Sequence, residues 1–237
     1  MDIRPDLAAA ISIAWSHIGQ PGTWWTGAER VAIAAESSNA MACPLCAARK
    51  HAISPVMVTG DHSDLGLVPT AAVHAIHRIR TDAGRLGEVW FRQTLAAGLT
   101  EDKYVELVSV VAITTAADSF DFAAGLPARA LPTPMAGPPS LRRPRNANAG
   151  PGWVYALMPA DRTADDPDFF GTARGTAHIH LALSLVPGSA IHFWDMLETM
   201  YQTSAMMRDF ARDYRAISHA QIELVAARVA ALNQCLY

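Results

Sequence analysis

Residues 26–46 read TGAERVAIAAESSNAMACPLC, and this stretch decides the fold class that the sequence predicts. Thr26 and Glu29 fit a capping box, in which the two side chains satisfy backbone amides at the start of a helix. The apolar residues that follow recur at helical spacing. We therefore expect a helix over 26–39 and, after it, a second helix that starts at the Cys-Pro-Leu-Cys motif.

The same signals recur along most of the chain. Polar caps and apolar residues at a period of about 3.6 mark each expected helix. The expected helices are 6–18, 26–39, 68–80, 86–97, 100–124, 178–185, 191–207 and 218 to the end. Since no sustained alternating strand pattern accompanies them, the sequence predicts an all-α protein.

One long segment, 127–176, differs from the rest because Pro and Gly cluster in it. Irregular connections of this length are unusual inside one compact domain. The expected organisation therefore has three parts. A first helical unit spans 1–126, a Pro/Gly-rich connection spans 127–176, and a second, shorter unit spans 177–237.

The two helical units share a pattern. Ser218 and Gln221 form a second capping box, which lies 192 residues after the one that begins at Thr26. Cys235 follows Cys43 at the same offset of 192 residues. The equal distance from cap to cysteine predicts two copies of one helical unit, related by a pseudo-twofold axis.

Composition excludes several classes of protein. Apolar residues make up 51% of the chain and charged residues 17%, which is typical of a globular protein. The formal net charge is −3, so nothing indicates a nucleic-acid or anionic-lipid partner. No apolar run reaches the roughly 18 residues of a membrane span, and no secretory signal is visible. The expected location is the cytoplasm, with no membrane partner.

The two cysteines of the Cys43-Pro44-Leu45-Cys46 motif are the main candidate site. Thiols stay reduced in the cytosol unless they serve redox or metal chemistry. Pro44 suits the first helical position, which leaves Cys43 at the N-cap, where the helix dipole stabilises a thiolate. Cys46, one turn later, can then resolve a sulfenate or a mixed disulfide. The opposite assignment of the attacking thiol stays open, because sequence does not show exposure.

Two other interpretations of the motif are weighed beside redox chemistry. The cysteines can be small core residues of an Ala-rich helix. They can also be half of a zinc site, but no second CxxC or His pair stands at structural-zinc spacing. We therefore expect no metal and no cofactor.

Three side chains near the motif are further candidates. Lys50 shares a helix face with both cysteines, and its charge would lower a thiol pKa. His51 lies one residue off that face and is a candidate acid or base. Glu36 is either a proton relay or a carboxylate at the end of a helix. His74 and His77, spaced i, i+3, are interpreted as a polar helix face and not as a metal pair.

These residues resemble the AhpD-like alkylhydroperoxidases of the carboxymuconolactone decarboxylase superfamily. That family carries Glu-x11-Cys-x-x-Cys-x-x-x-His on a helical hairpin, and residues 26–46 look like its opening helix and dithiol. The second copy is similar, since Glu223 lies twelve residues before Cys235. The resemblance implies an AhpD-like helical fold and, as is usual in the family, a homo-oligomer.

Each copy departs from the family motif. In the first copy Val31 stands at the Glu position and Lys50 at the His position. The second copy has Glu223 and Cys235, but no second cysteine in the given sequence. Only Cys43 and Cys46 therefore transfer directly for the first site, and only Glu223 and Cys235 for the second.

The resemblance implies a thiol-dependent oxidoreductase. A hydroperoxide or a disulfide partner would react with the Cys43/Cys46 dithiol, and an external thiol would reduce it. The rival hypothesis is a non-redox enzyme resembling the lactone decarboxylases, or a small-molecule-binding protein. A redox-sensing or assembly protein without turnover is a third.

Overall fold

The computed structural model describes residues 3–168 and 178–235, so parts of the expected connection 127–176 and both chain ends lie outside the described residues. The protein is mostly helical, which confirms the all-α expectation. The α-helices are α1 (Pro5–Ile18), α2 (Gly27–Asn39), α3 (Pro44–His51), α4 (Thr70–Asp82), α5 (Glu88–Ala96), α6 (Glu101–Ala124), α7 (His178–Leu181), α8 (Pro187–Met200), α9 (Ser204–Arg208) and α10 (His219–Leu232). Two two-residue strands, β1 (Asn148–Ala149) and β2 (Tyr155–Ala156), form an antiparallel pair.

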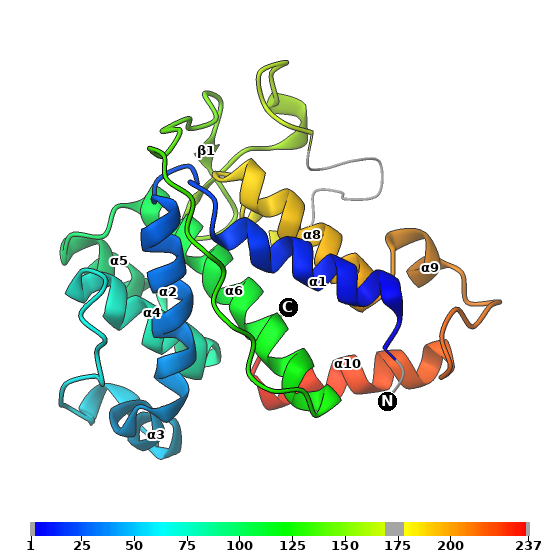
Figure 1. The fold of residues 1–237 in the computed structure, drawn as a ribbon, viewed down its shortest axis with the longest axis horizontal. Helices are drawn as coiled ribbons and strands as arrows, with labels where there is room; N and C mark the ends of the chain where they lie inside the picture. The colour runs from blue at the N-terminus through cyan, green and yellow to red at the C-terminus, as the bar shows by residue number, and fades with distance from the viewer. Residues whose placement is uncertain (1–2, 169–177, 236–237) are drawn as a thin grey trace.

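Helix α6 is the centre of the fold. It contacts α1, α2, α4 and α8, and Figure 1 shows these helices around it. Leu107, Val110 and Ile113 of α6 are buried in the main core. By length and hydropathy α6 could cross a membrane, and so could α2 and α3 together across a 59° bend. The core helix of a globular protein has similar length and hydropathy, because one of its faces is buried against neighbouring helices.

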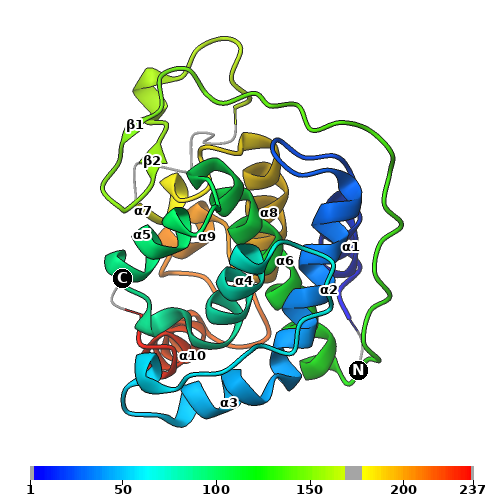
Figure 2. The same ribbon diagram turned by 90° about the vertical axis from the view of Figure 1, so that its left-hand side faces the viewer.

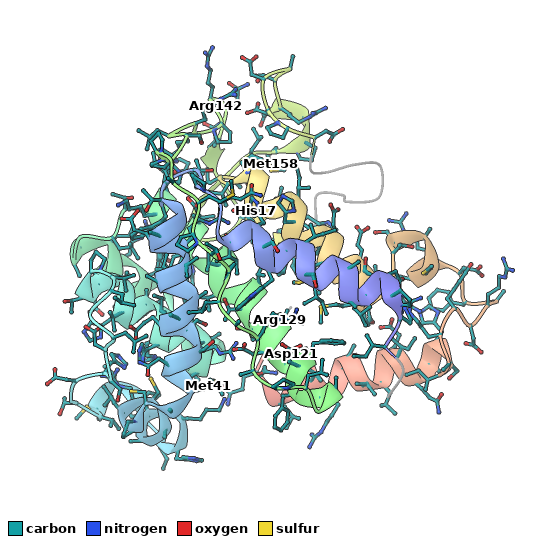
Figure 3. The ribbon with its side chains drawn as sticks, in the orientation of Figure 1. His17, Met41, Asp121, Arg129, Arg142 and Met158 are labelled. Carbon is teal, nitrogen blue, oxygen red and sulfur yellow. The ribbon has the colours of Figure 1, made fainter. Side chains whose placement is uncertain are left out.

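The end of α6 is fixed by two local features. Gly125 adopts a left-handed backbone conformation with φ of +68°, and its amide donates to carbonyls of the last turn. Beyond it, Arg129 forms an ion pair with Asp121 at 2.7 Å (Figure 3). The chain therefore leaves the helix at a defined point and turns back along α1.

Helix α2 starts at the capping box that the sequence predicts. Thr26 accepts from the amide of Glu29, and the Glu29 carboxylate accepts from the amide of Thr26. One turn later, the buried Arg30 lies 3.5 Å from the buried Glu106 of α6. Glu106 also accepts from the amide of Trp24. An ion pair without solvent exposure therefore joins α2 to α6.

The irregular segment after α6 follows α1 and the start of α2. Backbone hydrogen bonds join Met135 to Gly19 and Leu141 to Thr23. Figure 2 shows this segment running along the edge of the molecule, next to α1. Leu157 of the connection packs in a second core with Val105 of α6 and Trp194 of α8, so the described part of the connection lies against helices of both expected units. The proposed division at 126 and 177 stays a prediction.

Several expected helices differ in length. The helix expected over 191–207 is two helices, α8 and α9, with a break at Tyr201, Gln202 and Thr203. Thr203 caps α9 by accepting from the amide of Met206. The helix expected over 178–185 has only four residues. The apolar pattern over 191–207 is continuous, but the N-cap at Thr203 begins a new helix within it.

The two capped helices of the expected repeat have different surroundings. Ser218 and Gln221 form the predicted capping box of α10. However, α2 packs between α4 and α6, whereas only His219 of α10 is buried. The structure does not show the expected pseudo-twofold relation.

Candidate functional site

Helix α3 places the two cysteines of the motif at its N-terminus. Cys43 is the N-cap and Pro44 the first helical residue, as the sequence predicts. The other end of α3 is held by Arg85, which donates to the carbonyl oxygens of Arg49 and Ala52. Figure 2 shows α3 at one end of the molecule, beside α2. The ends of this short helix are therefore fixed, and the Cys43 thiol lies at its N-terminus, where the helix dipole is positive.

Two histidines from outside α3 contact the sulfurs. His62 Nδ1 lies 3.7 Å from Cys43 Sγ and 3.5 Å from Cys46 Sγ. His77 Nδ1, from α4, lies 3.2 Å from Cys46 Sγ. The four ligand atoms all lie within 4.8 Å of one another. Folding therefore gathers two thiols and two imidazoles in one cluster.

The Glu36 carboxylate lies behind His77. Its Oε1 is 2.8 Å from His77 Nε2, and both side chains are fully buried. Glu36 also accepts from the side-chain amide of Asn39 and from the backbone amide of Leu65. Since a carboxylate only accepts, His77 Nε2 donates to it and Nδ1 presents its lone pair to Cys46. Glu36, His77 and Cys46 thus form a hydrogen-bonded chain.

His62 takes the opposite tautomer. Its Nε2 lies 3.3 Å from Nη1 of Arg49, and a guanidinium can only donate. The ring proton is therefore on Nδ1, which points at the two sulfurs. Burial lowers the pKa of His62 to about 3, so the ring is neutral at pH 7. It can donate one hydrogen bond to a thiolate.

The two thiols have different acidities. Burial acts to raise the pKa of Cys43, but the backbone amides of Ser63 and Cys46, with the Cys46 and His77 side chains, outweigh it and lower this pKa to about 7. Burial raises the pKa of Cys46 to about 11, and the nearby Cys43 adds to the effect. At pH 7 Cys43 is therefore partly ionised to the thiolate, while Cys46 keeps its proton and donates it towards His77.

Both sulfur-bearing residues are buried. Cys43 is 1% exposed and Cys46 is 2% exposed. The segment between α3 and α4 covers them, and Ser63 donates its amide to Cys43 Sγ at 3.4 Å. Asn39 holds this segment by donating to the carbonyl oxygen of Ser63. A reagent can reach Cys43 only when the covering segment moves.

The structure separates the expected site residues into two groups. Cys43, Cys46 and Glu36 come together, and the relay interpretation of Glu36 agrees with its contact to His77. Lys50 does not point at the thiols, because its Nζ donates to the carbonyl oxygen of Thr81. His51 is exposed at the last position of α3.

The residues of the expected second copy lie elsewhere. Glu223, on α10, accepts from the hydroxyl of Tyr201 at 2.7 Å. Cys235 is exposed at the end of the described chain. Neither belongs to the cluster around Cys43.

Sequence reasoning missed His62 and misassigned His77. The interpretation of His77 as part of a polar helix face is wrong, since its side chain is fully buried at the thiols. Its helical spacing placed it correctly on α4, but nothing local showed which way α4 faces. His62 stands in an irregular segment without periodicity. One signal was present, because fifteen residues separate Cys46 from His62, within the range of CxxC–His spacings in zinc sites.

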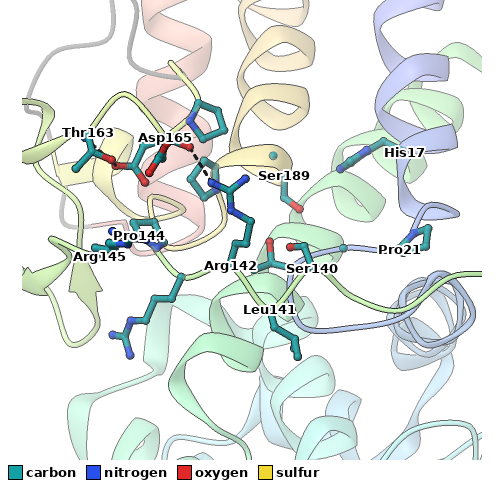
Figure 4. A pocket seen from close by; sticks show the side chains of 17 residues that line it. His17, Pro21, Ser140, Leu141, Arg142, Pro144, Arg145, Thr163, Asp165 and Ser189 are labelled. Carbon is teal, nitrogen blue, oxygen red and sulfur yellow. Dashed lines mark hydrogen bonds between the residues drawn. The ribbon is translucent and has the colours of Figure 1, made fainter.

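A separate pocket of about 480 Å³ lies at the other end of the molecule. Figure 4 shows its lining, in which Arg142 donates to the carbonyl oxygen of Asp165. His17 and Ser189 border it from α1 and α8. The dithiol is not among its lining residues, so any ligand of this pocket would bind independently of the thiols.

Comparison with known proteins identifies no relative of this chain. No protein-family model matches it, and neither a curated protein nor a solved structure does. We therefore infer the function from the geometry around Cys43 and Cys46.

Proposed function

We propose that this protein is an AhpD-like, thiol-dependent oxidoreductase that reduces a hydroperoxide or a disulfide partner through Cys43 and Cys46. One observation carries the proposal, namely the hydrogen-bonded chain from Glu36 through His77 to Cys46, beside a Cys43 thiol of lowered pKa. Burying a carboxylate and a histidine costs free energy. Two cysteines that only fill the core would not require such groups beside them.

The first step belongs to Cys43. Its thiolate attacks the distal oxygen of the hydroperoxide, and the O–O bond breaks. Cys43 becomes a sulfenic acid, and the leaving alkoxide takes a proton to become an alcohol. The N-terminus of α3, the Ser63 amide and Nδ1–H of His62 stabilise the thiolate before attack.

The second step belongs to Cys46. His77 Nδ1 takes the proton of the Cys46 thiol while Glu36 stabilises the imidazolium that forms. The Cys46 sulfur attacks the Cys43 sulfur, the S–O bond breaks, and the hydroxide leaves as water with the transferred proton. Two equivalents of an external thiol, oxidised together to one disulfide, then reduce the protein disulfide to two thiols.

In the family motif a histidine four residues after the second cysteine serves the relay. Here that position is Lys50, and His77 of α4 stands at the thiols instead, while Glu36 replaces the carboxylate expected at Val31. We propose that these two residues supply the relay from different places in the sequence. The second copy, with Glu223 and Cys235, would not contribute to turnover, because neither residue belongs to the cluster around Cys43.

Three further expectations form part of the same proposal. The sequence alone gives a cytoplasmic location and a pseudo-twofold relation between the two units, and the resemblance gives a homo-oligomeric assembly.

The decisive experiment is a peroxide titration of the reduced protein followed by mass mapping of its cysteines. We expect one equivalent of peroxide to convert Cys43 and Cys46 into an intramolecular disulfide that a dithiol reductant reverses. If both thiols remain reduced under excess peroxide, the proposal fails.

A second candidate function is small-molecule binding at the pocket bordered by His17 and Arg142. Its volume of about 480 Å³ lies within the range of ligand pockets. A thermal-shift screen of anionic metabolites, repeated on Arg142→Ala, tests it. A stabilising ligand that the variant no longer binds would support this function.

A further inference from the structure

The cluster around the dithiol offers a second kind of chemistry. We propose that Cys43, Cys46, His62 and His77 form a tetrahedral binding site for Zn²⁺ in the reduced protein. This inference goes beyond the proposed redox function and does not depend on it, since metal binding and peroxide reduction can each be measured without the other.

The distances between the ligand atoms fit one small ion. With Zn–S near 2.3 Å and Zn–N near 2.0–2.1 Å, the sulfur–nitrogen edges of a tetrahedron are roughly 3.6 Å. Three of the four sulfur–nitrogen pairs of the cluster are 3.2, 3.5 and 3.7 Å apart, and all four ligand atoms lie within 4.8 Å of one another. The ligand atoms therefore lie near the corners that Zn²⁺ requires.

The donor set selects the metal. Two thiolates and two imidazoles bind Zn²⁺ more readily than the hard ions Mg²⁺ and Ca²⁺, which prefer oxygen ligands. Four protein ligands leave no open position for water, as in structural zinc sites. The sulfurs are buried, and burial protects thiolate–metal bonds from competition by solvent.

His77 already has the orientation of a zinc ligand. Its Nε2 donates to the buried Glu36 carboxylate, so Nδ1 points its lone pair at the cluster. Zinc-bound histidines usually donate their second ring N–H to a carboxylate or carbonyl in this way. Asn39 and the Leu65 amide hold Glu36 in place for that role.

Cys46 and His62 must each change protonation to bind. Zn²⁺ displaces the proton of the Cys46 thiol, which is released to solvent. His62 must carry its ring proton on Nε2, so Nη1 of Arg49 must turn away from that nitrogen. The Nε of Arg49 donates to the carbonyl oxygen of Val58, which keeps the guanidinium nearby when Nη1 moves.

Metal binding and disulfide formation exclude each other. The disulfide consumes both thiolates, so oxidation removes two of the four ligands and expels the ion. A bound Zn²⁺ in turn withdraws the thiolate of Cys43 from attack on peroxide. The reduced protein would then exist in a reactive, metal-free form and a protected, zinc-bound form.

Cobalt titration of the full, reduced, metal-stripped chain tests the site. We expect one equivalent of Co²⁺ to give the visible bands of a tetrahedral ion together with thiolate-to-cobalt charge transfer, and Zn²⁺ to displace it. Cys43→Ser with Cys46→Ser is expected to abolish both signals. Absence of the charge-transfer band, or its persistence in the double variant, overturns the proposal.

Histidine variants test the two nitrogen ligands. His62→Ala and His77→Ala are each expected to weaken Zn²⁺ binding at least about tenfold. The matched control is His74→Ala. The His74 ring packs edge-on against the His62 ring, with 4.9 Å between the ring centroids, but His74 is not one of the four ligands. Unchanged affinity in His62→Ala, or equal loss in His74→Ala, contradicts the four-ligand site. Circular dichroism of each metal-free variant separates lost ligation from lost folding.

The two proposals fail in different ways. A metal-free protein that forms the disulfide but never gives the cobalt spectrum disproves only the zinc site. A protein that binds Co²⁺ through its thiolates but never forms the disulfide disproves only the redox function.

Discussion

His77 Nε2 lies 2.8 Å from Glu36 Oε1, although 41 residues separate the two in the sequence. Helices α2 and α4 pack against each other, and this packing brings both side chains behind the thiols of α3. Both residues are fully buried, so their hydrogen bond is not weakened by competition with water. The contact fixes the tautomer of His77 and makes its Nδ1 the base that faces Cys46.

Cys46→Ser is expected to stop peroxide oxidation at a sulfenic acid on Cys43. The variant keeps the acidic thiol but has no second sulfur to close the disulfide. Trapping with dimedone and mass mapping should locate one adduct, on Cys43. Cys235→Ser is the control and should form the Cys43–Cys46 disulfide normally. A disulfide between Cys43 and Cys235 in the first variant would contradict this assignment.

The rate of peroxide attack on Cys43 is expected to rise with pH and to level off above a midpoint near 7. The reactive species is the thiolate, and the pKa of Cys43 is lowered to about 7. Below the midpoint the rate should fall about tenfold for each pH unit, as the thiolate fraction does. Stopped-flow measurement between pH 5 and 9 checks this. A rate that keeps rising through pH 8.5 would indicate a thiol of ordinary acidity.

Glu36→Gln is expected to slow disulfide closure by on the order of a hundredfold, while attack on Cys43 changes little. The amide no longer stabilises the imidazolium that forms on His77 when Cys46 loses its proton. Single-turnover kinetics separates the two steps, because sulfenic acid then accumulates before the disulfide. Glu223→Gln makes the same chemical change on α10, far from the thiols, and should leave both steps unchanged. Equal slowing of both steps by Glu36→Gln would indicate a structural role instead.

Arg49 and Lys50 are neighbouring cations on α3 with different expected roles. Arg49→Ala should slow attack on Cys43 about tenfold, because the variant no longer fixes the tautomer of His62. A tenfold change corresponds to roughly the free energy of one hydrogen bond to a charged group. Lys50→Ala should leave the rate unchanged, since Nζ donates to the Thr81 carbonyl. Peroxide kinetics of the two variants at pH 7 makes the comparison. A larger loss in Lys50→Ala would reverse the assignment.

Arg30→Met is expected to destabilise the protein by about 3–5 kcal/mol, because it leaves the buried Glu106 carboxylate without its partner. Burial already raises the pKa of Glu106, so the variant should lose less stability at acidic pH, where that carboxyl is protonated. The comparison variant is Arg143→Met, whose partly exposed pairs with Glu101 and Asp102 are worth about 1 kcal/mol or less. Urea unfolding monitored by tryptophan fluorescence measures both variants.

The sequence by itself determined the local features of this protein. Capping boxes at Thr26 and Ser218, Pro44 at the start of α3 and Gly125 at the end of α6 are all where the pattern predicts them. Such features depend on hydrogen bonds and backbone conformations within a few residues, so they can be inferred without knowledge of the fold. For the same reason the N-cap position of Cys43 was predictable.

Tertiary structure decided which side chains join the two cysteines and Glu36 in the site. Helical spacing put Lys50 on the same face as the cysteines, but a flexible side chain turned to the carbonyl of Thr81. His62 and His77 approach the thiols because the segment after α3 folds back and α4 packs on α2 and α3. These contacts join residues far apart in the chain, and their free energy comes from burying helix faces together. The local sequence does not show which neighbouring helix or segment a buried polar side chain will contact.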